Sequence, residues 1–184
     1  MRTRINRRTR RAATSALAAV TASVLVAPGT APAGSGGVGT PGSSEAGPKG
    51  KAKLQGGKAI PPTDAPSRVV NAIEAANEIV KGKGYCLGGG HGSWKSKCYD
   101  CSGAVSYALH GGRMLDSPLP SGAFTKWGSK GKGDWITVYA NSGHMYAVIA
   151  GLRLDTSLTD GAGPGWSNDM RSSGGYKVRH YKSF

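Results

Sequence analysis

The spacing of apolar residues changes along this 184-residue chain, and that change limits the folds it can adopt. Between Pro66 and Gly82 they recur every three to four residues, which predicts an amphipathic helix with one buried stripe. In the last third they alternate with polar residues, which predicts strands over residues 135–140, 144–150 and 152–155. Helices followed by a run of antiparallel strands indicate an α+β domain, with N-terminal helices packed on a sheet.

Shorter elements complete this outline. A second helix is predicted over residues 102–110, where it ends at two glycines, and a helical turn over 121–127. The dipeptide Ala150–Gly151 separates two predicted strands and fits a tight turn, so those strands should form a hairpin. Residues 176–180 fit a final strand.

The first 33 residues have the composition of an export signal. Residues 1–11 carry six arginines and no acid, residues 12–27 are mostly apolar, and an Ala-Pro-Ala site follows at 31–33. This order predicts a secretory signal peptide over residues 1–33, and therefore an extracellular protein, with the export route open. The apolar run is shorter than the roughly 20 residues that a membrane helix needs, so we expect no stable membrane span.

Residues 34–62 are rich in Gly, Ser, Pro and Lys and contain little to bury. They predict a disordered linker, which leaves residues 63–184 as one folded domain. The formal net charge is +14, and it falls to +8 without the six N-terminal arginines. The remaining excess favours an anionic partner such as a cell-wall surface. No motif for RNA or DNA recognition is evident, so nucleic acid is not an expected partner.

The chain has three cysteines, Cys86, Cys98 and Cys101. In an exported protein an odd number suggests one disulfide and one free thiol. Cys101 stands where the second predicted helix begins, and the unpaired N–H groups and positive dipole end of a helix stabilise a thiolate there. The small neighbours Ser102 and Gly103 leave room for a substrate carbonyl beside the sulfur. Cys101 is therefore the candidate nucleophile.

A nucleophilic cysteine needs a base, and a third group that orients the base. His144 begins a predicted central strand, so the sheet would hold its imidazole rigidly. If Ala150–Gly151 makes the hairpin turn, Asp155 runs back beside His144 and can fix its tautomer. Cys101, His144 and Asp155 form a candidate nucleophile, base and orienting carboxylate.

Four sequence elements stand in the order found in NlpC/P60 cysteine peptidases: YCLGGG, YDCSGAVSYAL, GDW and GHMYAVIAG. The chain resembles this family over about residues 67–155. The resemblance implies a papain-like α+β fold and a secreted, wall-associated thiol protease. Such an enzyme cleaves amide bonds in peptidoglycan stem peptides, typically between D-γ-glutamate and the diamino acid. We expect a monomer that needs neither a cofactor nor a metal.

Carried over position by position, the family's nucleophile falls on Cys101 and its base on His144. Its tyrosine that helps to hold the oxyanion falls on Tyr85. Asp100 and Ser102 match positions that in relatives touch the free amine of the stem peptide. These assignments are what the resemblance implies for the substrate-binding side of the site.

The chain also departs from the family pattern. Leu87 stands in place of a tryptophan, and the third polar position, usually His, Asn or Gln, falls on Asp155. Cys98 replaces a glycine and Cys86 is also unusual, and we interpret the two as a disulfide that pins the glycine-rich loop. The substitutions leave the choice of substrate open.

Other interpretations remain for the cysteines. Cys86, His91, Cys98 and Cys101 could form a Cys3His zinc site in an interaction domain, because Cys-x-x-Cys is a common half-site. Cys98 and Cys101 could form a redox pair, although no suitable strand precedes them. The domain could also keep its fold and bind cell wall without catalytic activity.

Overall fold

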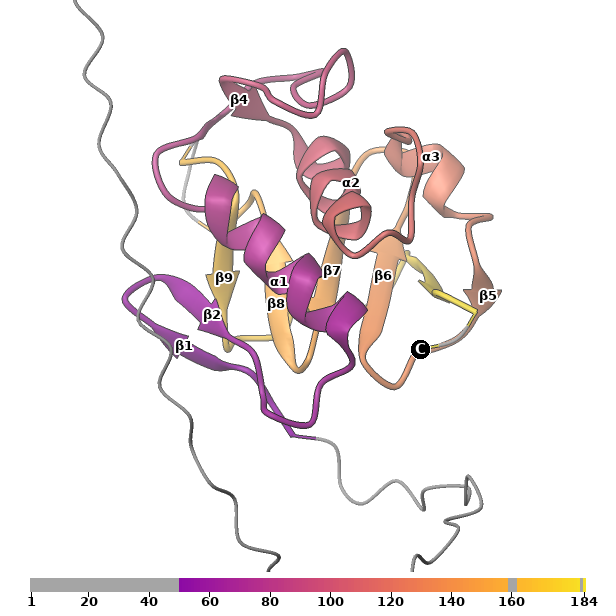
Figure 1. Ribbon diagram of the computed structural model, residues 1–184. Helices are drawn as coiled ribbons and strands as arrows, with labels where there is room; N and C mark the ends of the chain where they lie inside the picture. The colour runs from indigo at the N-terminus through magenta and orange to yellow at the C-terminus, as the bar shows by residue number, and fades with distance from the viewer. Residues whose placement is uncertain (1–49, 159–161, 183) are drawn as a thin grey trace, which may run out of the picture. The chain divides into compact units, whose positions relative to one another are not determined.

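Six antiparallel strands form the main sheet, and the two longer helices lie across one face of it (Figure 1). The computed structural model describes residues 50–158, 162–182 and 184. Across the sheet the strands are β5 (Ser129–Lys130), β10 (Lys177–His180), β6 (Ile136–Ala140), β7 (Met145–Ile149), β8 (Leu152–Asp155) and β9 (Gly165–Ser167). The predicted α+β architecture is confirmed.

The two helices are α1 (Ser67–Ile79) and α2 (Cys101–Gly111), which pack on one another. Buried residues of α1 recur at the predicted helical spacing, at Val69, Ala72, Ile73, Ala76 and Ile79. Helix α2 is buried along almost its whole length and lies against β7 and β8. The short helix α3 (Ser121–Phe124) contributes Phe124 to the core and contacts β6.

Strands β6, β7 and β8 alternate between a core face and an outer face. Their core-facing side chains are almost fully buried, and they are Ile136, Val138, Ala140, Met145, Ala147, Ile149, Leu152 and Leu154. The β7–β8 hairpin turns at Ala150 and Gly151, whose φ angles of 46° and 83° are both positive. Two positive φ angles match the type I′ turn that two-residue hairpins favour. This turn brings the end of β8 back toward the start of β7.

Part of the predicted linker is folded, so its predicted boundary at residue 62 is wrong. Strands β1 (Lys53–Gln55) and β2 (Lys58–Ile60) form an antiparallel hairpin beside α1 (Figure 1). The hairpin docks through the fully buried Ala59, whose N–H and C=O both bond the Asn77 side-chain amide. Because the hairpin buries little more than this one alanine, its sequence shows no alternating apolar pattern that would predict strands. The predicted signal peptide and residues 34–49 lie outside the described residues.

The glycine-rich loop is held by a two-stranded parallel ladder and a disulfide. Strands β3 (Gly84–Tyr85) and β4 (Cys98–Tyr99) pair at its two ends. Cys86 and Cys98 are bonded, with their Cα atoms 5.6 Å apart. Within the described residues, no helix has the length and apolar character needed to span a membrane.

Candidate active site

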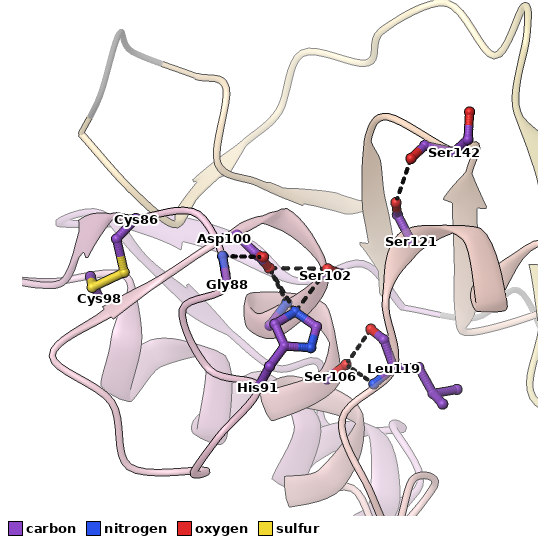
Figure 2. Close-up of polar contacts among 11 residues, drawn as sticks. Cys86, Gly88, His91, Cys98, Asp100, Ser102, Ser106, Leu119, Ser121 and Ser142 are labelled. Atoms are coloured by element: carbon purple, nitrogen blue, oxygen red, sulfur yellow. Dashed lines mark hydrogen bonds and ion pairs between the residues drawn. A yellow bond between two sulfur atoms is a disulfide. The ribbon is translucent and has the colours of Figure 1, made fainter.

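A cleft of about 380 Å³ lies at the N-terminus of α2. Its walls come from the glycine-rich loop, the first turn of α2, the start of α3 and the loop before β7. Ser106 Oγ bonds both the N–H and the C=O of Leu119, which ties the loop before α3 to α2 (Figure 2). Ser121 Oγ donates to the Ser142 carbonyl and joins two of the walls. Segments distant in sequence are therefore fixed around one opening.

Cys101 is the first residue of α2 and lines this cleft. It is the one free cysteine and is 8% exposed. Asp100 caps the helix by accepting a hydrogen bond from the Gly103 N–H at 2.7 Å. The capped start of α2 presents the sulfur at the positive end of the helix dipole.

His144 lies between Cys101 and Asp155. Its Nε2 is 3.0 Å from Asp155 Oδ1, and the Cys101 side chain is near enough to affect the pKa of its ring. Since Nε2 is engaged by the carboxylate, Nδ1 is the ring nitrogen left for the sulfur. The hydrogen bond that His144 donates to Asp155, followed by the interaction with Cys101, raises the pKa of His144 from 6.5 to about 9, against the opposing effect of burial.

Asp155 is the buried anchor of this arrangement, with a fully buried side chain. Burial alone would raise the pKa of Asp155, but hydrogen bonds from His144 and Ser157 outweigh it and lower the pKa to about 2. Ser157 donates twice to Oδ1, from its N–H and its hydroxyl. Arg171 Nη1 lies 3.1 Å from Oδ2 and completes the set of hydrogen bonds. The carboxylate is therefore ionised and oriented at neutral pH.

Asp100 and Ser102, which flank Cys101 in the sequence, form a second polar cluster with His91 (Figure 2). His91 Nε2 is 3.0 Å from both Asp100 Oδ1 and Ser102 Oγ, and the Ser102 hydroxyl donates to the same carboxylate oxygen. Burial would raise the pKa of Asp100, but bonds from Gly103, His91 and Ser102 lower it. Asp100 Oδ2 accepts the Gly88 N–H. Any substrate amine at Asp100 must compete with these donors.

Tyr85 lines the cleft from the glycine-rich loop and is 43% exposed. Partial burial, followed by the electrostatic effects of Cys101 and Asp100, raises the pKa of its hydroxyl. The phenol therefore keeps its proton at neutral pH and can donate a hydrogen bond into the cleft. That capacity is what an oxyanion donor requires.

The disulfide decides between the interpretations of the cysteine cluster. Cys86 and Cys98 are bonded to each other, so neither offers a thiolate to zinc and Cys98 is not the partner of Cys101. His91 lies on Asp100 and Ser102 instead. Among the described residues, no group of three His, Cys, Asp or Glu side chains could hold a metal ion.

Three site residues were not identified from the sequence. The sequence suggested His91 only as a possible zinc ligand, although its place in GGGHG ahead of the DCSG element was a usable signal for this cluster. Ser157 follows Asp155 by two residues, a spacing at which a side chain commonly bonds the chain ahead of it. Arg171 is 16 residues from Asp155 in an irregular segment, and nothing in the sequence links the two.

Comparisons with known proteins return similar structures only. No family model matches the chain, and no curated protein sequence matches it. It is similar to the P60 domain of an antigen of M. avium subspecies paratuberculosis, at 18% identity over 61% of this chain and 94% of that one, with a TM-score of 0.45. It is also similar to a mutated form of the Resuscitation Promoting Factor Interacting protein RipA, at 21% identity over 73% of this chain and 70% of that one, with a TM-score of 0.48. A third similar structure is that of a hypothetical invasion protein of Mycobacterium tuberculosis, at 22% identity over 72% of this chain and 69% of that one, with a TM-score of 0.47. At these values, function has to be argued from the residues of the site.

Proposed function

We propose that this protein is a cysteine hydrolase that cleaves amide bonds in peptidoglycan stem peptides, as the resemblance to NlpC/P60 peptidases implies. The observation that carries the proposal is the grouping of three residues: Cys101 lines a cleft, it affects the pKa of His144, and His144 Nε2 bonds Asp155. A free cysteine at a helix start, beside a histidine that a buried carboxylate orients, is the arrangement that nucleophilic catalysis requires.

In the proposed reaction, Cys101 Sγ attacks the amide carbonyl carbon and its proton passes to His144. The raised pKa of His144 favours the imidazolium, which then gives its proton to the leaving amine as the C–N bond breaks. Water next attacks the thioester carbonyl and loses a proton to His144, which releases the acid product and the thiol. The Cys101 backbone N–H and the Tyr85 hydroxyl are proposed to hold the oxyanion in both steps.

Asp100 and Ser102 line the cleft next to Cys101, and we propose that they contact the amine end of the stem peptide. The preferred bond is the one between D-γ-glutamate and the diamino acid. We also propose an extracellular, wall-associated location. The predicted signal peptide supports it, and so does the disulfide, since such bonds persist in oxidising compartments.

Thiol labelling and trapping of the acyl intermediate test this proposal. Iodoacetamide added without reductant should modify Cys101 quickly, and Cys101→Ala should take up no label. Acid quenching during turnover of a synthetic stem tetrapeptide should leave an adduct whose mass equals the acyl fragment on the peptide that contains Cys101. Hydrolysis by the wild type with an unreactive Cys101 thiol and no adduct would show that a cysteine mechanism is wrong.

A further inference from the structure

Arg171 lies outside the cleft but contacts the innermost member of the candidate catalytic group. It belongs to the irregular segment between β9 and β10. Its Nη1 is 3.1 Å from Asp155 Oδ2 and 2.9 Å from Ser157 Oγ. Neither Arg171 nor its neighbours line the cleft around Cys101; Arg171 lines a separate cavity of about 420 Å³ that includes outer-face side chains of β6 and β7. Arg171 therefore reaches the candidate catalytic group through Asp155, both directly and by way of Ser157.

The two oxygens of Asp155 are held by different groups. Oδ1 faces His144 Nε2 and both donors of Ser157, each at 3.0 Å. Oδ2 accepts one hydrogen bond among the described residues, from Arg171. Arg153 Nε is 3.6 Å from Oδ2, which is an ion-pair contact too long for a hydrogen bond. Rotation of the carboxylate about its Cβ–Cγ bond is thus restrained at Oδ2 chiefly by Arg171.

The guanidinium is itself held in place by two tyrosines. It lies 5.5 Å from the centre of the Tyr146 ring and 5.7 Å from that of Tyr176. Tyr146 stands on β7 two residues after His144, is 1% exposed, and stacks on Tyr139 with ring centres 4.6 Å apart. Arg171 is therefore fixed to the strand that begins directly after His144. The two rings already restrict the arginine side chain, so the side chain loses less conformational entropy when it bonds Asp155.

We propose that Arg171 is a positioning residue for the His144–Asp155 pair. It holds Oδ2 of Asp155 so that Oδ1 stays aimed at His144 Nε2, which leaves Nδ1 directed at Cys101. The inference rests on the proposed function, because it takes His144 as the base. Beyond that function, the inference states that Arg171, on the segment between β9 and β10, completes the orientation of His144 from outside the cleft.

The test compares Arg171→Gln, which removes the charge, with Arg171→Lys, which keeps it, and with Arg153→Gln as the matched control. Arg153 places a cation near the same oxygen without a hydrogen bond. Two readouts are taken in protein with 15N-labelled histidine: the low-field resonance of the His144 Nε2 proton, and kcat and KM on a synthetic stem peptide. We expect Arg171→Gln to lose or broaden that resonance and to lower kcat roughly 10- to 100-fold with little change in KM.

Arg171→Lys should recover part of the resonance and of kcat, and Arg153→Gln should change both less than Arg171→Gln does. If Arg171 acts as a nearby charge only, Arg171→Gln will keep the resonance and raise the pKa of His144, and the inference is then wrong. Equal effects of both glutamine variants would overturn it as well. If Arg171→Gln does not fold, Arg171→Lys is compared with wild type instead. An ammonium fits Asp155 Oδ2 less well than a guanidinium, so the inference requires that Arg171→Lys disturb the His144 resonance, and an unchanged resonance would overturn it.

Failure of this inference can be told apart from failure of the proposed function. The resonance is measured without substrate, so its loss in Arg171→Gln supports positioning even if no stem peptide is cleaved. Cleavage by the wild type with an unaltered resonance and kcat in Arg171→Gln would leave the hydrolase proposal intact and remove Arg171 from it.

Discussion

Replacing Asp155 with asparagine should lower both the pKa of His144 and the rate of hydrolysis. The wild-type pKa of His144 is raised from 6.5 to about 9, first by the hydrogen bond with Asp155 and then by Cys101. That interval corresponds to about 3 kcal/mol of preference for the imidazolium. If Asp155 supplies about half of it, Asp155→Asn should lower the pKa of His144 by about one pH unit.

The kinetic loss should be larger than the change in pKa alone implies. An asparagine presents an amide that can turn its NH2 toward His144 and so favour the wrong tautomer. We expect kcat/KM to fall on the order of 100-fold. The assays are an NMR titration of His144 and the hydrolysis of a synthetic stem peptide, with the exposed Asp169→Asn as the matched control. An unchanged pKa together with unchanged kcat/KM would refute the assignment of Asp155 as the orienting group.

The same variant should also change how stability depends on pH. The pKa of His144 is raised on folding, so its contribution is complete below about pH 6.5 and is lost as the pH rises to about 9. The pKa of Asp155 is lowered to about 2, so its contribution is present above about pH 3.8 and is lost as the pH falls toward 2. The stability difference between wild type and Asp155→Asn should therefore be greatest between about pH 4 and pH 6.5. A difference that grows steadily from pH 7 to pH 10 in chemical denaturation would contradict this sign.

Two further predictions concern the frame of the cleft. Replacing Cys86 and Cys98 together with alanine should lower the free energy of unfolding by about 3 kcal/mol, because the disulfide closes a loop with a sequence separation of 12. Denaturant titration measures this loss. A loss below about 1 kcal/mol would mean that the loop is held mainly by its other contacts. Gly103→Ala should destabilise the fold by about 1 to 3 kcal/mol, since the added Cβ would meet the Gly89 carbonyl oxygen. The matched Gly122→Ala, whose Cβ meets nothing within 4 Å, should be nearly neutral, and similar losses for both would remove the steric explanation.

The sequence predicted those elements that carry a periodic apolar pattern. Helix α1 and strands β6, β7 and β8 fall within one or two residues of their predicted ranges. The hairpin turn at Ala150 and Gly151 was also predictable from local chemistry, and it brings Asp155 to His144. The contact between His144 and Asp155 could therefore be predicted from the local sequence of the hairpin.

Other features depend on contacts that no local pattern encodes. The β1–β2 hairpin docks through the small Ala59 and an amide on α1, so its sequence is similar to that of a flexible linker. Arg171 reaches Asp155 only because the segment after β9 folds back over Tyr146. His91 was visible in the sequence, but its bonds to Asp100 and Ser102 depend on the fold of the glycine-rich loop.

The central claim is that Cys101 cleaves an amide bond of cell-wall peptides. Mass spectrometry of the soluble fragments released from purified peptidoglycan tests it most directly, with wild type and Cys101→Ala compared at equal concentration. The account predicts that wild type releases fragments with new amino and carboxyl ends at the D-γ-glutamyl bond, and that Cys101→Ala releases none above the level of untreated wall. Equal release of the same fragments by both proteins would contradict it.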